Sequence, residues 1–222
     1  MTIAELQQLV ASHLQDAAGK LASVDVVAAI QEALAGRYSK DSPQMLLVDL
    51  AGDGVKDEWD LAGITTWQNG FSRIVQIEYP QGERNPEFLT DDDWMIYESP
   101  DGPFLRFAFA LTNGKAARVK FTARHATDTS TAPDADLYAL GALAAALAAR
   151  RLAALYSQTG DSSIAADTVN YRSKAQEYLA LARKLEQDYE NLLGTDPERT
   201  APAASRTSDW KGKTAGGDRL TH

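Results

Sequence analysis

The sequence predicts an α+β protein: an α-helical bundle with two N-terminal and two C-terminal helices, an inserted antiparallel β subdomain and an extended C-terminal arm. Apolar residues recur at helical spacing at both ends, alternate with polar residues in the middle, and nearly disappear from the last segment. The expected boundaries are 1–40 for the N-terminal helical hairpin, 44–128 for the β subdomain, 129–194 for the C-terminal helical hairpin and 195–222 for the arm.

Helix-boundary residues predict the N-terminal hairpin. Thr2 and Glu5 have the spacing of a capping box, in which each side chain bonds to the other residue's backbone N–H. Gly19 is expected to end this helix in a left-handed conformation. A second helix is expected from Ser23, as its N-cap, to a point near Gly36. The short connection favours an antiparallel pair.

Alternation of apolar and polar residues predicts the strands of the middle segment. In the last of them Val119, Phe121 and Ala123 face one way, and charged or polar residues face the other. The expected strands are 45–50, 71–79, 94–98, 104–111 and 117–125. Within the second strand, Val75 and Ile77 are expected to share one face.

Turn residues predict how these strands connect. Pro100-Asp-Gly-Pro103 is a strong turn signal between the third and fourth strands. Asn113-Gly114 favours a two-residue hairpin between the fourth and fifth strands. Together these signals predict an antiparallel meander with one half-buried face.

Two further helices are expected after Pro133. The first is rich in Ala, which lets neighbouring helices approach closely, and its apolar run 137–149 is too short to span a bilayer. The second ends at Gly194 and carries a heptad-like seam. The seam consists of Tyr171, Ala175, Tyr178, Ala182, Leu185, Tyr189 and Leu192.

The segment 195–222 differs in composition from the rest of the chain. It is rich in Pro, Ser, Thr and Gly, and its five basic and four acidic residues give it a charge of +1. The chain total of −9 therefore leaves −10 for the rest. The segment is expected to be an arm that is free in the monomer and folds on contact with a partner. Trp210 lies among cations, as interface anchors do. The expected docking residues are Arg206, Trp210, Lys211, Lys213 and Arg219.

Composition and motifs exclude several function classes. The chain has no Cys, which removes disulfides, thiol nucleophiles and thiolate zinc sites, and it has only three His. Its acidic charge argues against a protein that grips DNA. No export signal, phosphate-binding loop or nucleophile elbow occurs. No enzymatic activity, cofactor or membrane partner is therefore expected.

Two acidic stretches are the candidates for metal binding. Asp49, Asp53 and Asp60 fall at positions one, five and twelve of a calcium-loop pattern, but position three is Ala51 and the flanks are not helical. A solvated acidic loop is the preferred interpretation. The run 91–93 of three Asp is more simply a solvated turn that caps local backbone N–H groups.

The order of these segments resembles the head-tail connector (adaptor) proteins of long-tailed bacteriophages. The stretch from Ile164 to Tyr178, leading into the last helix, carries the resemblance best, together with 53–80 and the strand that ends at His125. It covers nearly the whole chain up to Gly194. The β insertion is a departure, because the simplest connectors are almost entirely helical.

The resemblance implies a structural virion protein that forms a ring, commonly of twelve copies, between the portal and the stopper or tail components. Its C-terminal segment would dock on the portal, and double-stranded DNA would pass through the lumen without specific binding. Packing between subunits would involve Tyr171, Ala175, Tyr178, Ala182, Leu185 and Tyr189. The expected location is the virion neck, after synthesis in the cytoplasm of the bacterial host. The acidic charge fits such a conduit, since it repels the duplex.

Three alternatives remain open at this stage. The nearest is another phage neck or tail-completion protein. A monomeric ligand- or calcium-binding module and a small hydrolase built on the β segment belong to other classes.

Overall fold

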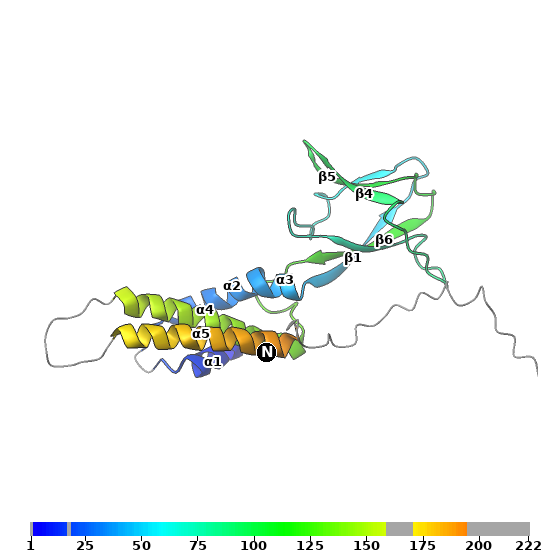
Figure 1. Cartoon of the computed structure of the whole chain (residues 1–222). Helices are drawn as coiled ribbons and strands as arrows, with labels where there is room; N and C mark the ends of the chain where they lie inside the picture. The colour runs from blue at the N-terminus through cyan, green and yellow to red at the C-terminus, as the bar shows by residue number, and fades with distance from the viewer. Residues whose placement is uncertain (1, 17–18, 159–170, 195–222) are drawn as a thin grey trace, which may run out of the picture.

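A computed structural model of the chain describes residues 2–16, 19–158 and 171–194. The N-terminal helices are α1 (Ile3–Leu14), α2 (Ser23–Ala33) and α3 (Ser39–Asp41), with a π-helical turn over Leu34–Tyr38. The strands are β1 (Gln44–Ala51), β2 (Glu58–Asp60), β3 (Ile74–Glu78), β4 (Trp94–Ser99), β5 (Gly102–Phe107) and β6 (Ala116–Ala123). The C-terminal helices are α4 (Leu137–Gln158), preceded by a 3₁₀ turn over Asp134–Asp136, and α5 (Tyr171–Leu193). The α+β class is confirmed (Figure 1).

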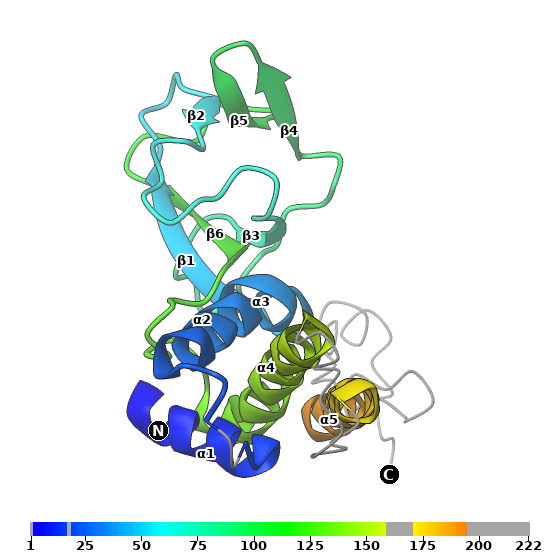
Figure 2. The same ribbon diagram turned by 90° about the vertical axis from the view of Figure 1, so that its left-hand side faces the viewer.

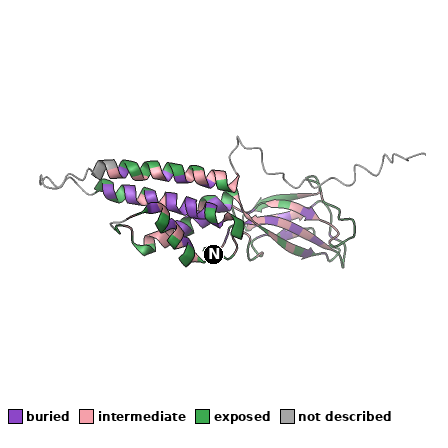
Figure 3. Cartoon of the chain, turned by 90° about the horizontal axis from the view of Figure 1, so that it is seen from below, coloured by how far each residue is buried: buried purple, intermediate pink, exposed green. Residues whose placement is uncertain are grey.

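Helix α4 is the centre of the helical part. Figure 2 shows α5 on one side of it and α1 and α2 on the other, and all three pack against it. From Ala139 to Ala149, where most positions carry Ala, α4 is buried around nearly its whole circumference (Figure 3). Gly141 allows the closest approach, since a Cβ there would lie 2.5 Å from Leu9 Cδ2.

The sequence predicts that the apolar run 137–149 is too short to span a bilayer, and this prediction needs correction. The helix that contains it extends over Asp134–Gln158 and is long and apolar enough to cross a membrane, since an 18-residue window within it has a mean hydropathy of 1.4. However, 72% of that apolar window is buried inside the structure. Its apolarity is therefore accounted for by its place in the core of the bundle.

The predicted capping box is present at the start of α1. Glu5 N–H donates to Thr2 Oγ1 at 3.3 Å, and Thr2 N–H donates to Glu5 Oε2 at 2.6 Å. The other end differs from the prediction, because the helix ends at Leu14 and its left-handed cap is Gln15 (φ 47°) instead of Gly19.

The second helix also differs from its prediction. Ser23 is its first residue and not its cap, and Ala22 precedes it without a side-chain bond. The helical path does not close near Gly36. It bends there (φ −94°, ψ −108°) and continues to Asp41, and the Ser39 hydroxyl donates to the Leu34 carbonyl across the bend. The Leu34 carbonyl thus accepts both the backbone N–H and the hydroxyl of Ser39.

The strands form two separate three-stranded antiparallel sheets, ordered β1-β6-β3 and β2-β5-β4. The predicted hairpin around 100–103 is confirmed as β4–β5. The predicted meander is wrong, because β5 and β6 belong to different sheets. The turn at Asn113-Gly114 therefore leads from one sheet to the other. The short strand β2 was not predicted.

Strand β6 is the middle strand of its sheet, and its predicted alternation is confirmed. Val119, Phe121 and Ala123 are buried, and the residues between them are partly exposed. The expected common face of Val75 and Ile77 is wrong. The pairing of β3 with β6 shifts between Ile74 and Gln76, which leaves Val75 half exposed while Ile77 is fully buried.

A polar joint connects the helical part to the β part. The backbone N–H of His125, just after β6, donates to Ser39 Oγ at 2.9 Å. The ring Nε2 lies 2.7 Å from the Ser42 carbonyl, so this nitrogen is assigned the proton. The ring packs on Tyr38 at a centroid distance of 4.9 Å, and Tyr38 donates in turn to Asp136 Oδ2 at 2.8 Å. Two hydrophobic clusters, one helical and one in the β part, lie on either side of this joint.

Gly52 gives a test of the backbone packing in the β part. A Cβ at this position would lie 2.5 Å from the Thr112 carbonyl oxygen, and backbone atoms cannot move aside as a side chain can. Gly52→Ala is expected to lower the free energy of unfolding by about 1–3 kcal/mol, measured by urea denaturation. At Gly63 the nearest atom is 3.4 Å away, so Gly63→Ala is the matched control. Equal effects of the two substitutions would contradict this account.

Candidate functional site

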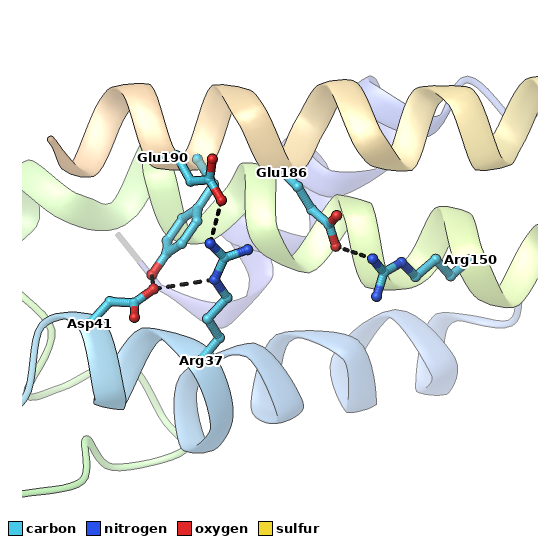
Figure 4. Close-up of polar contacts among 6 residues, drawn as sticks. Arg37, Asp41, Arg150, Glu186 and Glu190 are labelled. Carbon is cyan, nitrogen blue, oxygen red and sulfur yellow. Dashed lines mark hydrogen bonds and ion pairs between the residues drawn. The ribbon is translucent and has the colours of Figure 1, made fainter. Parts of the chain in front are cut away.

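The C-terminal end of α5 is held against the π-helical turn and α3, and it fixes the point from which residues 195–222 continue. Arg37 Nη2 lies 2.5 Å from Glu190 Oε1, and Arg37 Nε lies 3.3 Å from Asp41 Oδ2. The same Asp41 oxygen accepts the Tyr189 hydroxyl at 2.8 Å (Figure 4). The predicted stop is confirmed, since Gly194 follows α5 with a φ of 73° and donates its N–H to the Glu190 carbonyl.

The burial of each side chain indicates which of these contacts contributes most to anchoring the end of α5. Tyr189 is fully buried, whereas the side chains of Arg37 and Glu190 are 42% and 41% exposed. Exposed ion pairs contribute about 0–1 kcal/mol. Burial, followed by the bond to Asp41, raises the pKa of Tyr189 above its ordinary value, so its hydroxyl remains a donor throughout the neutral range. The buried phenol, more than the ion pairs, anchors the end of α5.

A second polar contact attaches α5 farther along its length. Arg150 Nη2 of α4 lies 2.5 Å from Glu186 Oε1, one turn of α5 before Glu190 (Figure 4). Beyond it, Tyr178 stacks on Tyr156 of α4 with ring centroids 5.5 Å apart. Polar and aromatic contacts therefore accompany the apolar packing of α5 along α4.

The structure places most of the predicted subunit-packing residues in the core of the helical part. Ala175, Ala182, Leu185 and Tyr189 are buried, and Tyr178 packs at the edge of the same cluster. Residues of the same chain cover them, mainly from α4, so the heptad-like seam accounts for the pairing of α4 with α5. Contact between subunits through these residues, and through Tyr171, whose side chain lies outside the description, stays a prediction. Leu192 is 60% exposed.

The predicted docking residues of the arm lie outside the described residues. They are Arg206, Trp210, Lys211, Lys213 and Arg219. What the structure adds is the start of the arm, next to the joint between the helical and β parts.

The carboxylates of the calcium-loop pattern have separate partners. Asp49 accepts bonds from Arg118 and Gln81, and the Arg118 bond is the main cause of its lowered pKa. Asp53 accepts the backbone N–H groups of Val55 and Lys56, which lower its pKa. Asp60 accepts Ala62 N–H. Within ranges 2–16, 19–158 and 171–194, no group of three or more His, Asp or Glu is arranged to hold a metal ion.

Asp93, in the other acidic run, and His125, the histidine considered for a hydrolase, both form hydrogen bonds with nearby residues. In the run 91–93, Asp93 caps a turn by accepting the N–H and hydroxyl of Thr90, which lowers the pKa of Asp93. A histidine at the end of a strand is usually a polar surface residue, but His125 is an exception. It is buried, and its ring contacts the Ser42 carbonyl and the Thr131 hydroxyl.

Two clefts in the β part were missed by sequence reasoning. One, of about 340 Å³, lies between the 67–73 loop and the β4–β5 hairpin, and Trp67, Phe71, Ile96 and Pro103 provide its apolar surface. The other, of about 510 Å³, lies between β1, β2 and the loop after β2. The only signal in the sequence was the density of aromatic residues in this segment, which core packing also explains.

Comparisons with known proteins are limited to partial structural matches. Neither a protein-family model nor a curated protein matches the chain. Solved structures that match include a chain from the neck of an empty gene transfer agent (GTA) particle, computed with C6 symmetry. It is 14% identical, with 80% of this chain and 88% of that chain covered and a TM-score of 0.30.

A chain from the virion of a native GTA particle is 16% identical, with coverage of 80% and 88% and a TM-score of 0.27. A third, from the neck of a native GTA particle computed with C12 symmetry, is 17% identical, with coverage of 79% and 86% and a TM-score of 0.27. TM-scores this low do not establish a shared fold.

Tyr189 gives a test of the anchored helix end. Tyr189→Phe removes the donor to Asp41 in a buried setting, so the free energy of unfolding is expected to fall by about 1 kcal/mol, measured by chemical denaturation. Tyr138→Phe is the control, because this side chain is 61% exposed and its hydroxyl has no hydrogen-bond partner among the described residues. The anchoring role would be refuted by identical denaturation midpoints for Tyr189→Phe and the unmodified protein.

Proposed function

We propose that the protein is a structural component of the neck of a phage or phage-like particle, an adaptor that forms a ring between the portal and the stopper or tail. The observation that carries the proposal is the order of elements: two N-terminal helices, a β insertion, two C-terminal helices and a polar arm. The sequence resembles head-tail connectors in this order of elements. It departs from the simplest of them in the β insertion.

The charge distribution supports a conduit for DNA. Residues 44–128 contain fourteen acidic and eight basic residues, so the β part carries most of the net negative charge. Several basic side chains are also paired with carboxylates, as in Arg106–Glu58, Arg118–Asp49 and Lys115–Glu83. A surface of this kind repels the phosphate backbone, and DNA can then pass along it without being held.

The fixed start of the arm supports portal docking. Because Tyr189 holds the end of α5 against α3 and the helix stops at Gly194, the arm continues from one defined place on the molecule. Its cations and Trp210 provide the mixed polar and aromatic chemistry of an interface anchor. In this proposal residues 195–222 dock on the portal, and copies of the chain, twelve in the resembling proteins, surround the channel.

The test combines the full chain and a chain that ends at Gly194 with the portal protein encoded in the same genome. The full chain is expected to co-sediment with portal rings, and electron microscopy is expected to show an added ring-shaped layer. The shortened chain is expected to remain folded, since both hydrophobic clusters lie before residue 195, but to lose portal binding.

A circular dichroism melt of the shortened chain serves as the folding control. Normal assembly of the shortened chain on portals would refute the role of the arm. Failure of the full chain to bind portals, with binding to tail components instead, would favour another neck or tail-completion protein.

A further inference from the structure

The cleft between the 67–73 loop and the β4–β5 hairpin has both apolar and polar lining residues, two of them charged. Trp67, Phe71, Ile96 and Pro103 line it, and its volume of about 340 Å³ is within the range of small binding pockets. The loop that forms one wall is held in place by bonds in both directions between Gln68 and Ser72, and Trp67 Nε1 donates to Asn69. Bonds within the loop, each of them involving a residue that lines the cleft, therefore shape this wall.

The rim carries one cation and one anion that are available for a ligand. Arg73 and Glu98 both line the cleft and are exposed. Within the part of the chain that the structure describes, neither the Arg73 guanidinium nor the Glu98 carboxylate has a hydrogen-bond or ion-pair partner. A ligand that fits would place an aromatic or apolar group between the walls, flanked by one negative and one positive charge.

The larger cleft does not offer this combination. Its charged residues are Lys56 and Asp60. Lys56 Nζ lies over the ring of Trp59, at 5.3 Å from its centroid, and Asp60 accepts the N–H of Ala62. Its charges are therefore engaged within the chain.

One segment of the chain matches the smaller cleft in sequence. Trp210 stands between Asp209 and Lys211, in an arm where the only other large apolar residue is Leu220. The acidic neighbour complements Arg73, and the basic neighbour complements Glu98. Large aromatic residues flanked by complementary charges are typical anchors of interfaces.

The arm is also long enough, and begins close enough, to reach the cleft. The backbone N–H of Thr122 donates to the Arg73 carbonyl. Thr122 lies three residues before His125, and the backbone N–H of His125 donates to Ser39 in the joint. Asp41, two residues after Ser39, accepts the hydroxyl of Tyr189 near the end of α5. The fourteen residues from 195 to 208 can span up to about 46 Å when extended.

We propose that this cleft is the docking site for residues 209–211 of the same chain. In the isolated protein Trp210 contacts the apolar residues of the cleft, with Asp209 at Arg73 and Lys211 at Glu98. The docked arm withholds Trp210 from any other protein until it is released. This proposal does not depend on the neck function, because it concerns the free chain alone.

Because the chain contains no Cys, engineered thiols can test the docking without background. The test variant carries Glu98→Cys and Lys211→Cys in the full-length protein. The matched control carries Asp91→Cys and Lys211→Cys, since Asp91 is also acidic and exposed but precedes β4, whereas Glu98 lies near its end. Dilute protein is oxidised, and disulfides are measured by non-reducing electrophoresis and peptide mass spectrometry.

The test pair is expected to form an intramolecular disulfide about tenfold faster than the control pair. A tenfold ratio corresponds to a docked contact of about 1.4 kcal/mol. Adding Trp210→Ala or Arg73→Glu to the test variant should remove most of this difference. Equal rates for the two pairs would overturn the proposal. Disulfide-linked dimers in place of the monomeric product would also overturn it, because the occupant would then be the arm of a second copy.

Discussion

The close packing around α4 is the constraint on which the helical part depends. Three helices bury their apolar faces on α4, and this is possible because Ala and Gly occupy most of its contact positions. At Gly141 even one added carbon would meet Leu9 Cδ2 at 2.5 Å. Larger side chains on α4 would push α1, α2 or α5 outward. Since α5 packs chiefly on α4, the place where the arm leaves the molecule is also set by these small residues.

A set of hydrogen bonds, and not a shared apolar core, fixes the orientation of the β part relative to the helices. The two hydrophobic clusters are separate. Tyr38, which belongs to the helical cluster, is joined to Ser39, Ser42, His125 and Asp136 by a connected set of hydrogen bonds. Hydrogen bonds have defined directions, whereas the hydrophobic effect is non-directional. The burial of Tyr38 raises the pKa of its hydroxyl, so its bond to Asp136 persists across the neutral range. This set of bonds gives the β part a defined orientation.

Features that depend on neighbouring residues could be predicted from the sequence, and features that depend on distant ones could not. The capping box at Thr2, the alternation in β6 and the stop at Gly194 are local, and all three were predicted correctly. The division of the strands into two sheets depends on which distant segments pair, and turn signals at 113–114 gave the wrong connection. The cleft combines residues 67–73, 96–98 and 103, which no local pattern links. Sequence reasoning singled out Trp210 by its composition, but it gave no sign of a complementary surface on the same chain.

The ends of the β part have a consequence for how such chains can diversify. Gln44 and Ala123 are paired in the register of β1 and β6, so the part enters and leaves the helical scaffold through neighbouring positions. A segment with adjacent ends can be lost, gained or exchanged in a single genetic event, because the scaffold has only a short gap to close. Related chains can therefore keep the same helices around an Ala-rich centre while presenting a different outer module, or none.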